Sequence, residues 1–132
     1  MRSSPSLDPE RQRGSATVEF VLVGSLVVLL GLALVQLVLA LHVRNTLTSS
    51  AYEGARTAAQ ADRGLADGED RARSLARDAL GGIAVDTDAW EASVDGAPVA
   101  VVELSAPAPV VGMWGPGTLR VEARAFEESG DG

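Results

Sequence analysis

Few side chains in this sequence are of the types that catalyse reactions or hold metal ions. Cysteine is absent, which excludes a thiolate metal site and a cysteine nucleophile, and His42 is the single histidine. Asp86 and Asp88 are spaced to share one face of a strand, where paired carboxylates could do acid–base work. No second catalytic group accompanies either feature. We therefore predict a solvated strand edge for the two aspartates and an interfacial position for His42.

Phosphate and nucleic-acid binding are not indicated either. Gly112, Gly115 and Gly117 lie among prolines and lack the strand-to-helix setting of a phosphate loop. The formal net charge is −7, and the 11 basic residues, all arginine, form no cluster of the kind that binds nucleic acid. The sequence predicts a protein that is not an enzyme and that takes no cofactor, no metal ion and no nucleic acid.

One carboxylate stands at an unusual place. Glu19 directly precedes the run Phe20–Leu41, which contains no charged residue. An ionised carboxylate that enters lipid is unfavourable unless a cation offsets its desolvation. By its position alone Glu19 is an ordinary interfacial charge, and its neighbours in the sequence decide whether it is more than that.

The uncharged run is long enough to cross a membrane. As an α-helix its 22 residues extend roughly 33 Å, against a hydrocarbon core of about 30 Å. It is longer than a signal-peptide core and no small-residue cleavage site follows it, so we predict a retained transmembrane helix. Basic residues flank it on both sides, and by a small margin they favour a cytoplasmic N-terminus: Arg2, Arg11 and Arg13 before it, Arg44 and Arg56 after it.

The residues before this run resemble the processing site of type IV prepilin-like proteins. In the stretch RQRGSATVEF a short basic leader ends at Gly14, and Glu19 is the fifth residue after it. In that family a membrane-bound aspartic peptidase cuts after the glycine. The resemblance implies cleavage between Gly14 and Ser15, and an assembly role for Glu19 and Phe20. In such a role the Glu19 carboxylate meets the free amine of a neighbour's Ser15.

A second motif lies just beyond the run. The stretch YEGARTAA, residues 52–59, resembles the E-G-A-R-x-A-A segment of TadE-like proteins, which are minor pilin-like components of tight-adherence (Flp) pilus systems. Four residues carry this resemblance: Glu53, Gly54, Ala55 and Arg56. A Pro-rich segment followed by GTLRVEARAFEE near the C-terminus is also similar to that family.

The resemblance implies a TadE-like minor pilin or pseudopilin in the bacterial cytoplasmic membrane, with its C-terminal part outside the cytoplasm. The implied partners are a prepilin peptidase, other pilin-like subunits, pilus assembly platform proteins and membrane lipid. The alternative is a single-span membrane anchor or sensor subunit that enters no filament. A membrane-tethered enzyme is disfavoured because catalytic groups are missing.

The elements that carry these residues predict an α+β membrane protein. A long transmembrane helix continues outside the bilayer, followed by a short second helix and a small antiparallel sheet of about three strands. Its parts are a cleavable, disordered basic leader (1–14), a transmembrane helix (15–43), its extramembrane continuation (44–63), an extracytoplasmic α+β domain (64–128) and a disordered tail (129–132).

Local signals predict the bounds of these elements. Gly64 should end the first helix, and a second helix should cover Glu69–Leu80, capped from Asp67 and ended by Gly81-Gly82. Its expected apolar side is Leu75, Ala76, Ala79 and Leu80. Three alternating segments, joined by a hairpin turn at Asp95-Gly96 and a loop at Met113–Gly117, are expected as strands: Trp90–Val94, Val99–Leu104 and Leu119–Ala125.

Small side chains recur at helical spacing after the transmembrane run. Ala51, Ala55, Ala58 and Ala59, with Tyr52, form one face of the extramembrane helix. This face either packs on the strands of the same chain or packs closely against neighbouring subunits.

Overall fold

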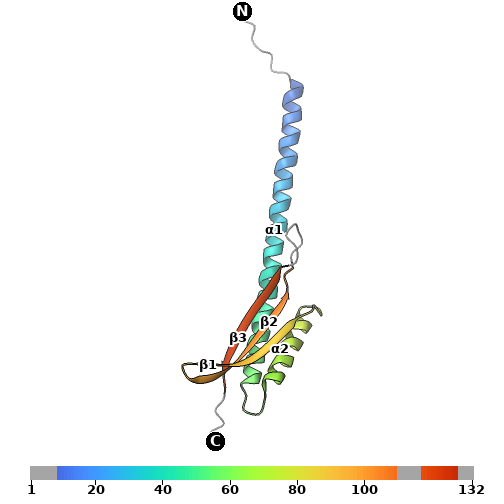
Figure 1. Cartoon of the computed structure of the whole chain (residues 1–132). Coiled ribbons are helices and arrows are strands. Elements are labelled where there is room, and N and C mark those ends of the chain that lie inside the picture. The colour runs from blue at the N-terminus through green and yellow to red at the C-terminus, as the bar shows by residue number, and fades with distance from the viewer. Residues whose placement is uncertain (1–8, 110–116, 128–132) are drawn as a thin grey trace, which may run out of the picture. The chain divides into compact units, whose positions relative to one another are not determined.

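The computed structural model describes residues 9–109 and 117–127, and it confirms the predicted fold class (Figure 1). Five elements follow one another in the chain: α1 (Pro9–Ala58), α2 (Leu65–Ala79), β1 (Asp86–Val94), β2 (Ala97–Pro107) and β3 (Thr118–Phe126). The contacts divide the chain into two units, Met1–Leu37 and Val38–Gly132, and α1 contributes to both. The expected tail at 129–132, most of the expected loop at Met113–Gly117 and the first part of the expected leader lie outside the described residues.

The expectation of a disordered leader up to Gly14 is wrong for its last part. The helix α1 begins at Pro9, so residues 9–14 are helical. Proline suits the first helical position, where its missing N–H is not needed and its fixed φ already matches the helix. The glutamate, arginine and glutamine that follow are good helix formers, and they extend the helix into the transmembrane run without a break.

The helix α1 ends at Ala58, five residues before the expected end at Arg63. Beyond it the Ala59 N–H still reaches the Ala55 carbonyl, at 3.0 Å, but the next bonds are tighter turns. The Gln60 N–H bonds the Thr57 oxygen at 3.3 Å, and the Arg63 N–H bonds the Gln60 oxygen at 3.0 Å. These three-residue turns reverse the chain within a few residues, so that α2 can pack back against α1.

The second helix begins four residues earlier than expected. Gly64 does not stop α1; its extended backbone, with φ −128° and ψ 176°, precedes the first residue of α2. Asp67 is inside the helix, where its Oδ2 accepts a hydrogen bond from the Gly64 N–H at 3.2 Å. The carboxylate is therefore one half of a capping box at the third helical position.

The end of α2 and the hairpin turn follow the prediction. Gly81 and Gly82 have positive φ values of 69° and 83°, and the Gly82 N–H bonds the Arg77 carbonyl at 2.8 Å. This is the left-handed helix end that glycine favours. Asp95 and Gly96, with φ values of 51° and 83°, form a two-residue turn that pairs Val94 with Ala97. Positive φ at both positions is typical of the turn that matches strand twist.

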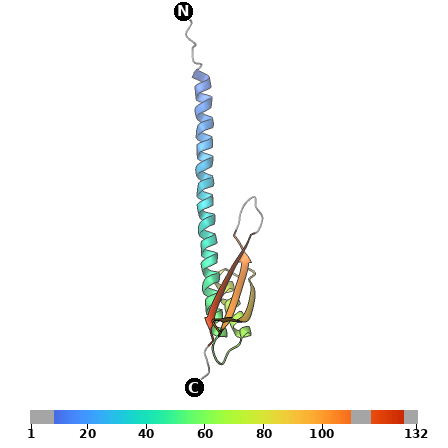
Figure 2. The same cartoon turned by 60° about the vertical axis from the view of Figure 1, so that its left-hand side comes forward.

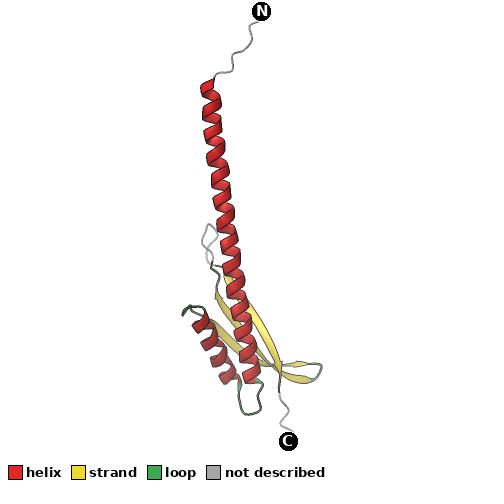
Figure 3. Cartoon of the chain, turned by 180° about the vertical axis from the view of Figure 1, so that it is seen from behind, coloured by secondary structure: helices red, strands yellow, loops and turns green. Residues whose placement is uncertain are grey.

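The three strands form one antiparallel sheet in the order β1-β2-β3. All three are longer than the predicted segments, because β1 begins at Asp86, β2 extends from Ala97 to Pro107, and β3 ends at Phe126. Pro107 ends β2, a place where the missing N–H breaks no interior ladder. The part of α1 after Val38 and the helix α2 lie on one face of this sheet (Figures 2 and 3).

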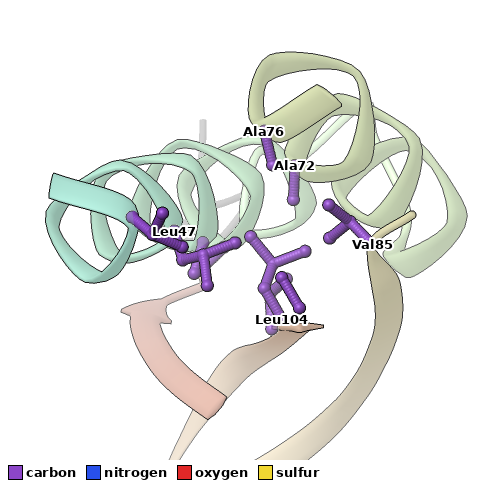
Figure 4. Packing of buried hydrophobic residues seen from close by; sticks show 10 residues of the cluster. Leu47, Ala72, Ala76, Val85 and Leu104 are labelled. Carbon is purple, nitrogen blue, oxygen red and sulfur yellow. The ribbon is translucent and has the colours of Figure 1, made fainter. Parts of the chain in front are cut away.

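The core lies between these two helices and the inner face of the sheet. Five labelled side chains converge there: Leu47 from α1, Ala72 and Ala76 from α2, Val85 just before β1, and Leu104 from β2 (Figure 4). The inward residues of β2 are the even-numbered ones, and Ala100, Val102, Leu104 and Ala106 are almost wholly buried. Small side chains on both helices let the backbones approach the sheet closely, which suits a domain with few aromatic residues.

Candidate functional site

The predicted cleavage site lies within helix. Gly14 and Ser15 are both in α1, both are exposed, and a Cβ added to Gly14 would meet no atom within 4 Å. The Thr17 hydroxyl donates to the Arg13 carbonyl at 3.1 Å across the same turn. The predicted scissile bond is therefore accessible from its side-chain side, but the backbone there is held in helical hydrogen bonds.

Glu19 and Phe20 are the next predicted site residues, and both are exposed. Phe20 leaves 79% of its surface uncovered, the largest fraction among the exposed large apolar side chains. Among the described residues Glu19 takes part in no ion pair or side-chain hydrogen bond. Within residues 13–109 and 117–127 of its own chain, Glu19 therefore has no cationic partner.

The helix that follows is long and apolar enough to cross a membrane. Its most apolar window, inside Arg13–Ala58, has a mean hydropathy of 2.7, and none of that window is buried. The large side chains from Val18 to Leu41 leave between 43% and 79% of their surface uncovered. Such a surface is stable in lipid or against other apolar helices and not in water.

The glycine of the E-G-A-R motif lies where α1 crosses α2. A Cβ added to Gly54 would come within 2.6 Å of both the Ala72 Cβ and the Gly68 carbonyl oxygen. The relation is reciprocal, because a Cβ added to Gly68 would lie 2.5 Å from the Gly54 oxygen and 2.5 Å from the Ala58 Cβ. The two backbones are in direct contact here, and only glycine permits that approach.

The other motif residues divide between the two sides of α1. Ala55 is completely buried against the core, whereas Glu53 and Arg56 are exposed. The alanines at 51, 55, 58 and 59 are all buried inside the chain. Of the two interpretations of this alanine face, packing on the same chain is the one that the structure shows. Tyr52 is 55% exposed and lies outside that contact.

Sequence reasoning missed Gly68 and misplaced the buried side of α2. The residues it buries are Gly68, Ala72 and Ala76, at a spacing of four, whereas Ala79 is exposed and Leu75 and Leu80 are half-buried. The spacing of three small residues was the available signal. Hydrophobicity predicted leucines on the buried side of α2, but two helices that cross closely need the smallest side chains at their contact.

The candidate catalytic groups are not assembled into a site within the described residues. His42, Asp86 and Asp88 are all exposed. The two aspartates line an open groove of about 510 Å³ together with arginines from α2 and β3, and no group of three metal-ligating side chains occurs in the described part of the chain. Gly112 and Gly115 lie outside the described residues, and Gly117 is exposed beside β3.

Comparison with known proteins finds a family that matches part of α1. Residues 14–56 match the family model described as TadE-like protein. The predicted resemblance is thus confirmed: the segment that contains the apolar helix and the E-G-A-R residues is TadE-like. No curated protein and no solved structure matched this chain.

Proposed function

We propose that this chain, TadE-like over residues 14–56, is a non-enzymatic minor pilin-like component of tight-adherence (Flp) pilus assembly. The observation that carries the proposal is the family match together with the uncovered apolar surface of the same helix. A helix with such a surface performs its function by packing in lipid and against other helices. The coarser statement, a pilus-associated membrane protein, is supported by the same match over residues 14–56.

The proposal includes processing by a prepilin peptidase between Gly14 and Ser15. Two observations support it. Both residues are exposed, and a Cβ added to Gly14 would meet no atom within 4 Å. The helical backbone at this point must open before a peptidase can bind it in extended form. The first turns of a helix open at little cost in free energy, so the site remains usable.

Cleavage then supplies the cation that Glu19 lacks. The new ammonium group of Ser15 exists only in processed chains, and it would offset the desolvation of a Glu19 carboxylate on a neighbouring helix. Proteolysis and assembly are linked by this pairing. The partners are other pilin-like subunits held beside the chain in the cytoplasmic membrane by pilus assembly platform proteins.

Replacing Gly14 with Leu is expected to leave a full-length, membrane-bound chain. The bulky side chain occupies the position that the peptidase must accommodate, whereas the wild-type chain should begin at Ser15. Mass spectrometry of the N-terminal peptide measures this directly. A Gly24→Leu chain is the matched control, because Gly24 also has open space around it but lies inside the span. A Gly14→Leu chain that still begins at Ser15 would contradict the processing proposal.

The part of the chain after the apolar helix is expected to lie outside the cytoplasm. Three arginines precede the uncharged run Phe20–Leu41 and two follow it, and basic segments stay preferentially in the cytoplasm. A phosphatase that is active only outside the cytoplasm, fused after Gly132, should be active in whole cells. The same fusion to a reporter that works only in the cytoplasm should be silent. The reverse pattern would reverse the orientation and remove the pilin-like function.

The second candidate function is a single-span anchor or sensor subunit. It is supported by the second unit, Val38–Gly132, whose core is formed by residues of the same chain. The two functions differ at the N-terminus, since an anchor has no use for a processed Ser15. A full-length chain in cells with an active prepilin peptidase would favour the anchor.

A further inference from the structure

The predicted scissile bond lies in the middle of the helical segment that precedes the apolar run. The helix α1 begins at Pro9 and the uncharged run begins at Phe20, so residues 9–19 are helical outside the run. The bond between Gly14 and Ser15 therefore has helix on both sides. A peptidase that binds its substrate in extended form meets this bond in a conformation that it cannot bind.

The leader supplies carbonyl groups that hold the scissile bond in the helix. In an α-helix each N–H bonds the carbonyl four residues earlier, which pairs the Ser15 N–H with the Arg11 carbonyl. The Thr17 hydroxyl adds a bond to the Arg13 carbonyl, at 3.1 Å. Both bonds cross the cleavage point, and each joins a leader residue to the chain that remains after cleavage.

Helix propensity is uneven along this segment. The four residues that precede Gly14 are good helix formers: Glu10, Arg11, Gln12 and Arg13. From Gly14 to Val18 only Ala16 is a good one. The part of the helix that contains the scissile bond is therefore weak by itself, and it depends on the turn before it.

Opening of this segment has to start from its N-terminal end. In hydrocarbon no water can replace a broken backbone hydrogen bond, so the helix within the apolar run stays closed. Outside the run water can replace these bonds, and a helix end opens more easily than its middle. Residues 9–14 lie between that end and the scissile bond, so they must unwind before the bond becomes extended.

We propose that the helical state of the leader, residues 9–14, inhibits processing and sets the rate at which the peptidase cuts. The inference rests on the proposed processing, since it concerns the rate of that cleavage. The reaction is hydrolysis: water adds across the amide, leaving a carboxylate on Gly14 and an ammonium group on Ser15. The peptidase binds only unwound chains, and helix opening is fast compared with proteolysis, so the rate follows the unwound fraction.

Paired alanine and glycine substitutions at Gln12 test this inhibition. Gln12 is uncharged and is neither of the two residues at the cut, so both substitutions leave the charge of the leader unchanged. Alanine favours the helix over glycine by about fivefold per residue. Gln12→Gly should therefore be cut about fivefold faster than Gln12→Ala. Pulse-labelling of the full chain in cells with a prepilin peptidase measures the fraction that begins at Ser15 against time.

The same pair at Thr17 separates helix stability from contact with the peptidase. Thr17 is exposed and lies on the other side of the scissile bond. Thr17→Gly should again be cut about fivefold faster than Thr17→Ala. Both variants lack the hydroxyl that bonds the Arg13 carbonyl, so that bond does not contribute to the difference. A residue that acts only by touching the peptidase gives no reason for equal ratios on both sides of the bond.

Ser74→Ala and Ser74→Gly are the matched control. Ser74 is exposed on α2, in the second unit of the chain. The two control chains differ in helix propensity by the same amount as the test pairs, but the difference lies far along the chain from the cut. They should be processed at equal rates.

Hydrogen exchange of the uncut full chain in detergent micelles gives a second measurement, which does not involve the peptidase. The amides of residues 13–18 should exchange about fivefold faster in Gln12→Gly than in Gln12→Ala, because both exchange and cleavage require the unwound state. A residue that served only in recognition would change the rate of cleavage and leave exchange unchanged.

Equal ratios for cleavage and exchange, at Gln12 and at Thr17, support the inhibition by the leader helix. Cleavage that ignores the alanine-to-glycine difference would overturn it, as would a difference at one position alone or an effect on cleavage without an effect on exchange. These results differ from a failure of the proposed function. A wild-type chain that never begins at Ser15 would overturn the processing itself, whereas rates independent of helix propensity would overturn this inference alone.

Discussion

Replacing Glu19 with Gln is expected to leave insertion and processing intact and to abolish pilus formation. The amide conserves the shape of the side chain but removes the charge, so entry into the membrane becomes slightly easier. If Glu19 pairs with the Ser15 amine of a neighbour, the substitution leaves a buried ammonium without its partner. Breaking one half of a buried pair costs about 3–5 kcal/mol, which lowers association by more than a hundredfold.

The measurement needs three readings on the same cells: the abundance of the chain in membranes, its N-terminal residue, and the number of pili per cell. Glu91→Gln is a matched control, because Glu91 is an exposed carboxylate on β1 in the second unit, outside the predicted span. It should leave all three readings unchanged. Normal piliation by Glu19→Gln at normal abundance would make Glu19 an ordinary interfacial charge.

Replacing Gly54 with Ala is expected to destabilise the second unit, Val38–Gly132, although it adds only one methyl group. That methyl would lie 2.6 Å from the Gly68 carbonyl oxygen and 2.6 Å from the Ala72 Cβ. The oxygen is part of the helix backbone, and the alanine side chain has no rotamer into which it could move. The two helices must therefore move apart. Overpacking of this kind costs about 1–3 kcal/mol, a large part of the stability of a small unit.

Thermal unfolding and limited proteolysis of the full chain in detergent measure this effect. Gly31→Ala is the matched control in the same helix, because a Cβ there meets no atom within 4 Å. In an exposed helix interior this control should be neutral or slightly stabilising, by about 0.5–1 kcal/mol. Gly68→Ala should resemble Gly54→Ala. Combining the two should cost less than their sum, since the first already separates the helices. Unchanged melting of Gly54→Ala would mean that the crossing is not close.

The Gly54 prediction separates two roles within one motif. Gly54 and Ala55 hold α1 against α2 and the sheet, whereas Glu53 and Arg56 are exposed on the same helix. Loss of assembly after a change at Gly54 would therefore follow from misfolding. Only changes at exposed positions can report on contacts with partners.

The sequence alone determined the features that depend on local chemistry. An uncharged run of 22 residues is sufficient to predict a transmembrane helix, since the bilayer selects for length and hydropathy and for little else. The turn at Asp95-Gly96 and the helix end at Gly81-Gly82 were also predictable, because positive φ is a property of single residues. Strand alternation placed Leu119, Val121, Ala123 and Ala125 on one face, because successive side chains of a strand point to opposite faces.

Element ends were less predictable, because neighbouring groups decide them. Gly64 was predicted to end the first helix, but it is the residue before α2. The Asp67 carboxylate inside α2 accepts a hydrogen bond from the Gly64 N–H. The end of α1 at Ala58 depends on the turn that brings α2 onto it. Residues 9–14 are helical because they continue the apolar helix in the N-terminal direction, and extending a helix is easier than nucleating one.

Only the tertiary structure decided what the small residues do. The alanine face of α1 could equally have served a neighbouring subunit, and its burial against β2 and α2 depends on contacts between distant parts of the chain. The pairing of Gly54 with Gly68 is of the same kind, because no local pattern joins two glycines on different helices. The register that aligns Asp86, Ser105 and Arg120 across three strands is likewise set by strand pairing, which the turn and the buried face determine together.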